Sequence, residues 1–257
     1  MSGRLLIARP EEGVAVLTLS NPGRGNALDE GLLQALDEAA ETFSDERALR
    51  AVVLTGAGDR AFSTGADIAA WGALDPLAFS RQWIARGHRL FGRLAGLPVP
   101  LIGAINGAAL GGGLELAALC DVRFAAPHAV FGLPETGLGV TAGWSGLQRL
   151  GRLMPQALLR EMALTGARLP AARLETAGFI NAVSADPLAA ALEAARRAAA
   201  LSPRAAEATR LVLMAAGGEA PAAALDRLAG LTVAATADAA CGREAFLTRK
   251  KPVFSGA

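Results

Sequence analysis

A triple glycine, Gly111 to Gly113, constrains the fold of this chain more than any other feature. Before it, the apolar run from Val99 to Ile105 reads as a buried strand. After it, Leu114 to Leu116 open a helical stretch that ends near Cys120. A strand, a glycine turn and a helix start expose backbone N–H groups, and only glycine lets a ligand approach them closely. Since a helix N-terminus also carries partial positive charge, this segment predicts a site for an oxyanion.

Two glutamates accompany this turn. Glu115 lies in the first helical turn, and Glu135 follows 20 residues later in a Pro-Glu-Thr-Gly loop, where functional side chains concentrate. Each feature taken singly has a structural explanation. The glycines could allow close helix packing, Glu115 could interact favourably with the helix dipole, and Glu135 could be an ordinary ion-pair partner. Together they predict an oxyanion site beside two carboxylates.

The first two-thirds of the chain alternates between strand and helix patterns, which indicates crossover units and a largely parallel sheet. The predicted strands are Val14–Leu19, Ala51–Leu54, and short ones at Phe124 and at Val130-Phe131. Between them we expect helices over Ala27–Phe43, with Asn26 as its N-cap, and over Leu77–Leu94, burying Phe79, Trp83, Leu90 and Leu94. Beyond Met154 only Phe179–Val183 reads as extended, and part of this helical third is expected to pack on another subunit.

Composition excludes several classes. In 257 residues, 25 basic and 24 acidic side chains leave a net charge of +1, which favours neither nucleic acid nor an anionic membrane. Two cysteines make no disulfide framework, which fits a reducing, cytoplasmic setting, with Cys120 a buried small hydrophobe. The longest apolar stretch, 99–120, is interrupted by Pro100, Asn106 and glycines and makes a poor membrane span.

Other catalytic patterns fail. The dinucleotide-binding fingerprint is not met, because Leu116 stands at its third glycine position. A P-loop is excluded as well, because no glycine is followed by Lys and then Ser or Thr. The two histidines, His88 and His128, lack the spacing or companions of a metal site or a Ser–His pair, so we expect them at the surface or in packing. Gly143 to Leu147 does not match a nucleophile elbow, and a serine hydrolase or peptidase is not expected.

Four segments resemble the enoyl-CoA hydratase (crotonase) family: Phe62–Ile68, Asn106–Leu116, Cys120-Asp121 and Leu133–Gly139. The match runs in order from Asn21-Pro22 to Pro252 and covers nearly the whole chain. The resemblance implies an α/β fold, a crotonase-like spiral of ββα units, with a C-terminal helical trimerisation region. Residues 1–195 would form the core with the acyl-CoA site, and 196–257 the oligomerisation region of a homotrimer or a dimer of trimers.

The resemblance also implies roles for particular residues. The backbone N–H groups of Ala66 and Gly112 would form an oxyanion hole for the thioester carbonyl, and Glu115 and Glu135 match the family's two catalytic glutamates. Arg24 matches the region near the CoA nucleotide, and Phe246 and Lys250 match a C-terminal helix that reaches a neighbouring subunit's CoA. The implied substrate-binding residues are Arg24, Ala27, Gly65, Asp67, Ile68, Gly111, Pro134, Gly143, Trp144, Phe246 and Lys250.

The activity so implied is hydration of a 2-enoyl-CoA. We expect Glu115 to stay ionised at a helix N-terminus and activate water, and Glu135 to give a proton to C2, the two titrating as a coupled pair. No metal or redox cofactor is required, since CoA is part of the substrate. The alternatives are an isomerase, another acyl-CoA lyase or hydrolase, or a non-catalytic RNA- or CoA-binding member.

The family's Gly-x-Gly-Gly reads Gly143-Trp144-Ser145-Gly146 here, and Trp144 either lines the acyl pocket or packs in the core.

Overall fold

The computed structural model describes residues 2–256, which fall into two compact units, one ending at Pro203 and the other beginning at Arg204. The division predicted after residue 195 falls within helix α9 (Pro187–Ala199), which packs on the core, and the first unit continues to Pro203.

The larger sheet of the first unit has six strands in the order β1-β2-β3-β5-β7-β10. Their bounds are Arg4–Glu11, Val14–Ser20, Ala51–Gly56, Leu101–Ile105, Val122–Ala125 and Ala182–Val183. Only β1 runs antiparallel to its neighbour, and the other pairs are parallel, as expected. Strand β1 was not predicted from the sequence, because an exposed edge strand carries no strong apolar pattern: its Leu6 and Ile7 are each 51% exposed.

The smaller sheet has four short strands in the order β4-β6-β8-β9, over Ala61–Ser63, Ala108–Leu110, Val130–Gly132 and Arg168–Pro170. The first three are parallel. The chain repeatedly adds one strand to the larger sheet, one to the smaller sheet and then a helical segment, so the predicted spiral of ββα units is confirmed. This topology brings the carboxyl ends of β4, β6 and β8 to the same edge, which is where ligands bind in parallel sheets.

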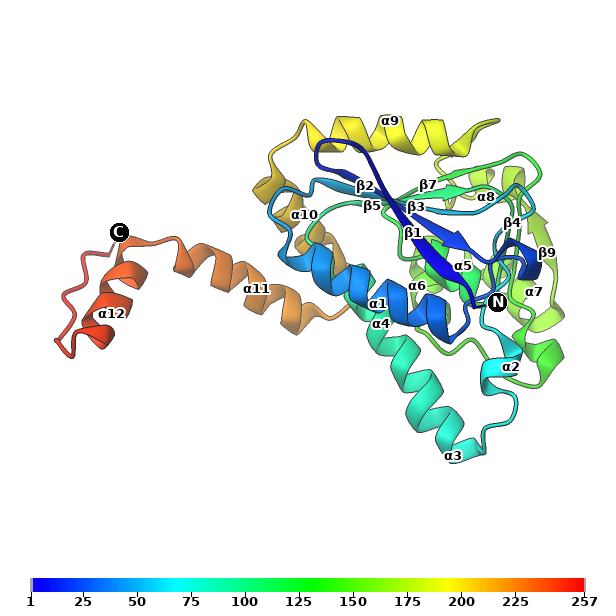
Figure 1. Ribbon diagram of the computed structural model, residues 1–257, viewed down its shortest axis with the longest axis horizontal. Helices are drawn as coiled ribbons and strands as arrows, with labels where there is room; N and C mark the ends of the chain where they lie inside the picture. The colour runs from blue at the N-terminus through cyan, green and yellow to red at the C-terminus, as the bar shows by residue number, and fades with distance from the viewer. Residues whose placement is uncertain (1, 257) are drawn as a thin grey trace. The chain divides into compact units, whose positions relative to one another are not determined.

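Helices enclose the sheets (Figure 1). α9 covers one face of the larger sheet, where its Ala191 and Ala195 pack among buried strand residues such as Val53 and Ile102. α1 (Glu30–Asp45) and α4 (Ala85–Ala95) pack on each other on the opposite side in Figure 1. The other helices of this unit are η1 (Pro22–Arg24), α2 (Ile68–Trp71), α3 (Pro76–Ala78), η2 (Phe79–Ile84), α5 (Gly112–Ala117), η3 (Glu135–Leu138), α6 (Gly146–Leu153), α7 (Gln156–Thr165) and α8 (Ala171–Thr176).

Two predicted helices differ from the structure. Asn26 is not an N-cap: its backbone is left-handed (φ 55°), and its buried side chain donates to the carbonyl groups of Ala57 and Ala61. α1 begins later and is capped by Asp29, whose side chain accepts from the N–H of Leu32. The helix predicted over 77–94 is interrupted by the π-helical turn η2, which turns Phe79, Trp83 and Ile84 toward a pocket.

The second unit is helical, with α10 (Pro203–Ala216), α11 (Pro221–Ala234) and α12 (Ala237–Leu247). This confirms the predicted C-terminal helices, whose role in trimerisation stays a prediction. Large apolar side chains remain exposed on α11 and α12, among them Leu225, Val233, Phe246 and Leu247. Across residues 2–256, no helix combines the length and the apolar character that crossing a membrane requires. The cytoplasmic location stays a prediction.

Candidate active site

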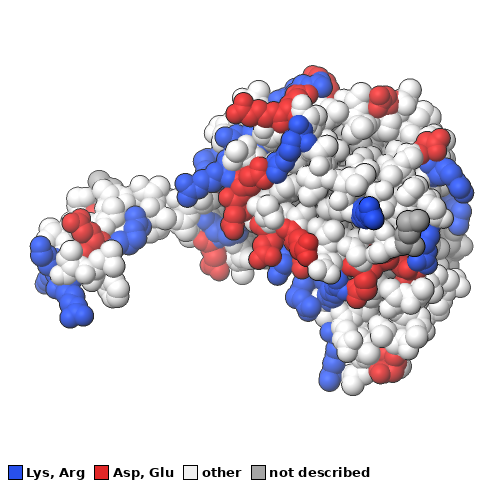
Figure 2. Space-filling view, viewed as in Figure 1, with Lys and Arg blue, Asp and Glu red and all other residues white. Residues whose placement is uncertain are grey.

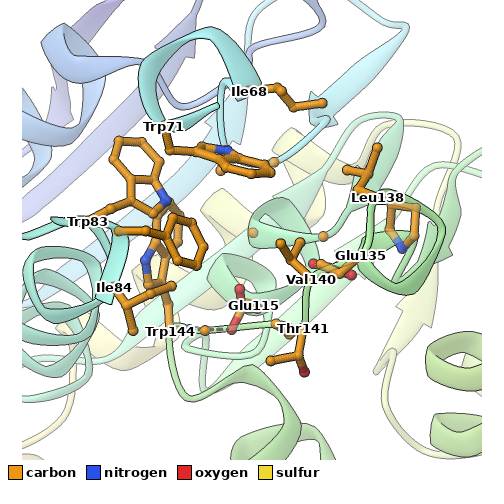
Figure 3. A pocket seen from close by; sticks show the side chains of 18 of the residues that line it. Ile68, Trp71, Trp83, Ile84, Glu115, Glu135, Leu138, Val140, Thr141 and Trp144 are labelled. Carbon is orange, nitrogen blue, oxygen red and sulfur yellow. Dashed lines mark hydrogen bonds between the residues drawn. The ribbon is translucent and has the colours of Figure 1, made fainter. Parts of the chain in front are cut away.

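Three segments that follow parallel strands of the smaller sheet line one pocket. Gly65 and Ala66 follow β4, Gly111 and Gly112 follow β6, and Pro134-Glu135 follows β8. Side chains from α2, η2 and the segment 140–144 complete the walls (Figure 3). The strand ends therefore place the glycine turn, one glutamate and the 63–66 turn around a common space.

The backbone N–H groups of Ala66 and Gly112 lie close together because glycines let their two turns touch. Gly65 has φ 93°, and a Cβ there would lie 2.9 Å from the Gly112 nitrogen and 2.7 Å from the Leu110 carbonyl oxygen. Gly112 is the first residue of α5, so its N–H has no intrahelical acceptor. Within the described chain, neither N–H donates to another residue. Two unengaged donors at one place suit a ligand oxygen that gains negative charge.

Glu115 is buried on α5, with 2% of its surface exposed. Its Oε1 accepts hydrogen bonds from the backbone N–H groups of Trp144 (2.9 Å) and Gly146 (2.7 Å). A Cβ at Gly146 would lie 2.2 Å from the Glu115 Cγ, so only glycine allows this approach. The side chain is therefore held by the backbone of the 144–146 segment, in the orientation that Figure 3 shows.

Burial raises the pKa of Glu115 from 4.5 to about 7. The two N–H groups that bind Oε1 act in the opposite direction, as does the nearby Arg149, while Glu135 raises the pKa further. The expectation that Glu115 stays ionised at neutral pH is therefore wrong: desolvation outweighs the backbone donors, and both forms are populated near pH 7.

Glu135 begins η3, separated from the end of β8 by two residues, and is half-buried. Burial is the main influence on its carboxyl group and raises its pKa. Among the described residues, no group donates to its buried Oε2 atom, and its Oε1 would lie 2.8 Å from a Cβ at Gly111. Figure 3 shows the carboxyl groups of Glu115 and Glu135 directed into the same pocket. A carboxyl oxygen without a partner is available to a bound molecule.

The outer walls of the pocket are apolar and largely aromatic. Trp71, Trp83 and Trp144, the chain's three tryptophans, all line it. Trp144 both lines the pocket and packs in the core, since its ring lies 5.6 Å from Trp83 and 5.0 Å from Phe91. The rarity of tryptophan in the chain was the one sequence signal that could have pointed to further lining residues. The lining residues that were not predicted are Thr64, Trp71, Phe79, Trp83, Ile84, Leu138, Val140, Thr141 and Ala142.

Several predicted binding residues lie outside this pocket. Arg24 and Asp67 form a bidentate ion pair, with distances of 2.7 and 2.8 Å between the guanidinium nitrogens and the carboxylate oxygens. Ala27, three residues after Arg24, is buried. Phe246 lies on α12 and Lys250 follows it, both in the second unit. The predicted lining residues Gly65, Ala66, Ile68, Gly111, Gly112, Pro134, Gly143 and Trp144 do surround the pocket with the two glutamates.

Both histidines lie at the surface, as expected, but His88 has a serine partner that the sequence did not suggest. His88 of α4 is paired with a serine: its Nδ1 lies 2.8 Å from the Ser145 Oγ. Sequence spacing could not reveal the pair, because 57 residues separate its members. Neither residue lines the pocket. His128 is exposed, with its Nε2 2.8 Å from the Asp59 carbonyl oxygen.

The described residues contain no group of three or more His, Cys, Asp or Glu side chains that could hold a metal ion. On the face that Figure 2 presents, acidic and basic side chains are interspersed. Ion pairs such as Arg93–Asp37 and Arg86–Glu30 join α4 to α1. The expectations about cofactors and nucleic acid stay predictions.

Comparison with known proteins places these features in context. Residues 9–257 match the family described as enoyl-CoA hydratase/isomerase. Over 178 residues the chain is 38% identical to a crotonyl-CoA hydratase from Syntrophomonas wolfei, covering 69% of this chain and 68% of that protein. It is 36% identical over 255 residues to a 2,3-dehydroadipyl-CoA hydratase from Escherichia coli, with 98% of each covered. The crystal structure of an enoyl-CoA hydratase from Bacillus anthracis superimposes with a TM-score of 0.80 at 30% identity, over 99% of this chain and 100% of that one.

Proposed function

The chain belongs to the enoyl-CoA hydratase/isomerase family, and on that premise we propose that it is a hydratase that adds water across the 2,3-double bond of a 2-enoyl-CoA. One observation carries the proposal: two carboxyl groups, Glu115 and Glu135, are directed into a pocket that also presents two unengaged backbone N–H groups. Each part has a task in this reaction.

The N–H groups of Ala66 and Gly112 receive the thioester oxygen. When water adds to C3, negative charge develops on this oxygen, and donors already in place stabilise it without reorganising. Each such donor contributes roughly 3–4 kcal/mol to the transition state in comparable oxyanion holes. Backbone donors suit the task because neighbouring glycines fix their positions.

The two glutamates divide the proton transfers. Glu115, ionised, takes a proton from the attacking water, whose oxygen bonds to C3. Glu135, protonated, gives a proton to C2, so that one molecule of water is added in total. Burial raises the pKa of both carboxyl groups, so each exchanges a proton closer to neutral pH than an exposed carboxyl group would. The pair titrates as a coupled unit, because each charge disfavours the other.

The acyl group that we propose for this pocket is uncharged. Among the described lining residues, Glu115 and Glu135 are the only ones with ionisable side chains, and Trp71, Phe79, Trp83 and Ile84 supply apolar walls. A terminal carboxylate, as in the adipyl group of the E. coli relative's name, would meet these walls without a cation to pair with. We therefore expect alkyl or aryl 2-enoyl groups to react faster than ω-carboxylated ones of equal length.

Assembly completes the proposal. We propose a homotrimer or a dimer of trimers in the cytoplasm, joined through the helices of the second unit, whose apolar side chains are exposed in one chain. Phe246 and Lys250 would contact the CoA of a neighbouring subunit. Arg24 would contribute near the nucleotide of CoA, beside its partner Asp67.

The test is hydration of a short 2-enoyl-CoA by the wild type, Glu115→Gln and Glu135→Gln. Loss of either general catalyst should lower kcat by about 10²- to 10⁴-fold. Because the chain has no tyrosine and all three tryptophans line the pocket, quenching of tryptophan fluorescence reports acyl-CoA binding, which both variants should retain. Full turnover by both variants would contradict the proposal. Conversion of a 3-enoyl-CoA without hydration would move the assignment to an isomerase.

A further inference from the structure

We propose that the hydrogen bond between His88 and Ser145 is a positioning device that fixes the backbone segment holding Glu115. The inference deepens the proposed function and rests on it, since it assigns how the proposed general base is kept in place. It starts from the 2.8 Å contact between the His88 Nδ1 and the Ser145 Oγ.

Ser145 stands where the backbone is strained. Its φ of 67° and ψ of 17° are left-handed, a conformation that costs energy for a residue with a Cβ and that glycine adopts freely. The residues on either side, Trp144 and Gly146, both donate their N–H groups to the Glu115 Oε1. A left-handed residue makes successive N–H groups converge on one anion. The strain at Ser145 therefore has a purpose: it aims both donors at one carboxylate oxygen.

Helix α4 supports this segment with one face. A Cβ at Gly87 would lie 2.0 Å from the Trp144 Nε1, so the glycine makes room for the indole ring. One turn further, Phe91 stacks on the same ring. His88, between them in sequence, reaches the next residue of the segment, Ser145. Gly87, His88 and Phe91 of α4 thus fix the position of Trp144 and Ser145 relative to the helix.

The other side of the segment is held by α6. The Arg149 Nη1 donates to the Trp144 carbonyl oxygen at 3.0 Å, and the Arg149 N–H donates to the Ser145 carbonyl oxygen. These contacts fix the carbonyl groups and leave the serine hydroxyl to His88. The His88–Ser145 bond is the contact that resists relaxation of the left-handed serine itself.

The pair does not act as a nucleophile and base. Neither His88 nor Ser145 lines the pocket, and the buried Trp144 does. Ser145 is therefore a positioning residue that acts through Glu115. If the bond is lost, the serine relaxes toward an ordinary conformation, and the two N–H groups leave Oε1. These donors lower the pKa of Glu115, so that pKa rises above about 7 and less of the base is ionised.

The experiment uses four variants of the full chain: Ser145→Ala, Ser145→Gly, His88→Ala and the double variant His88→Ala/Ser145→Gly. Alanine keeps the strain and loses the hydroxyl, whereas glycine removes the strain and the need for the bond. His128→Ala is the matched control, because it removes the other exposed histidine, which contacts a backbone carbonyl. The readouts are kcat as a function of pH and the Glu115 pKa from carboxyl ¹³C NMR, which needs no turnover.

We expect Ser145→Ala and His88→Ala to lower kcat at neutral pH by about two- to tenfold, the effect of losing one hydrogen bond, and to raise the Glu115 pKa. Ser145→Gly and His128→Ala should match the wild type, and His88→Ala should have no further effect in the Ser145→Gly background. An unchanged Glu115 pKa in both single variants, or an equal effect of His88→Ala in either background, would overturn the inference. Absence of hydratase turnover with these pKa shifts intact would instead refute the proposed function.

Discussion

At the scale of single residues, the behaviour of the site depends on a carboxyl group that the fold keeps from water. Glu115 is 2% exposed, and its pKa is about 7 in the folded protein against an ordinary 4.5. Between these values the folded protein binds more protons than the unfolded chain, so burial of Glu115 lowers stability as the pH rises through this window. This loss of stability is typical of active sites, where a general base works best with a pKa near neutral pH.

This cost predicts a pH-dependent gain in stability for Glu115→Gln. The amide still accepts the two N–H bonds but has no charge to desolvate. Its free energy of unfolding should exceed that of the wild type by a margin that grows between about pH 4 and pH 8, up to on the order of 3 kcal/mol. Urea denaturation at several pH values measures it, with Glu12→Gln at an exposed position correcting for the loss of a charge. A margin that is flat over this range would contradict the burial argument.

Gly65 provides a second prediction at this scale. A methyl group there would sit at φ 93° and within 3 Å of the Gly112 nitrogen and the Leu110 oxygen, so it would separate the two proposed oxyanion donors. We expect Gly65→Ala to lower kcat by about 10²- to 10³-fold, the usual cost of losing such a donor. Gly58→Ala is the control, since Gly58 also has positive φ but no neighbour within 4 Å of its built Cβ. Comparable losses in both variants would point to general strain.

At the scale of elements, the short helix α2 depends on contacts from outside itself. It has four residues, and Asp67 caps it by accepting from the Ala69 N–H while pairing with Arg24 of η1. α2 carries Ile68 and Trp71 to the pocket. The Arg24–Asp67 pair therefore joins the end of η1 to α2, which forms one wall of the proposed acyl site.

Asp67→Ala should accordingly impair substrate binding more than chemistry. Losing a cap costs about 1 kcal/mol, which corresponds to a rise of about fivefold in KM with little change in kcat. Asp67→Asn keeps an oxygen for the cap and removes the charge of the ion pair, so it should show the smaller rise. Steady-state kinetics with one acyl-CoA measures both. A fall in kcat at constant KM would show that α2 acts on the reacting atoms instead.

At the scale of the whole molecule, the second unit leaves apolar side chains exposed that a soluble single chain would bury. Phe246 and Leu247 of α12 are 84% and 79% exposed. If these helices form the proposed oligomer, light scattering should give three or six times the mass of one chain, and Phe246→Asp/Leu247→Asp should reduce it. Leu77→Asp, an exposed apolar position outside the second unit, is the control. A single-chain mass for the wild type would contradict the assembly.

The sequence determined the features that local pattern specifies. Continuous apolar runs were sufficient for β2, β3 and β5, and helical patterns for the helices after Met154. The glycine turn with Glu115 and Glu135 marked the strand ends that the structure brings together. Apolar periodicity and glycine carry these signals in the chain itself, because burial and positive φ restrict which residues are allowed.

Only the tertiary structure decided the remainder. It moved the start of α1 from Asn26 to Asp29, because the Asn26 side chain is used by the turn after β3. It placed all three tryptophans in one pocket, and it paired His88 with Ser145 across 57 residues. The pKa of Glu115 also belongs here, since desolvation depends on what surrounds a carboxyl group in space. Contacts between distant segments, and the burial that they produce, are absent from any local pattern.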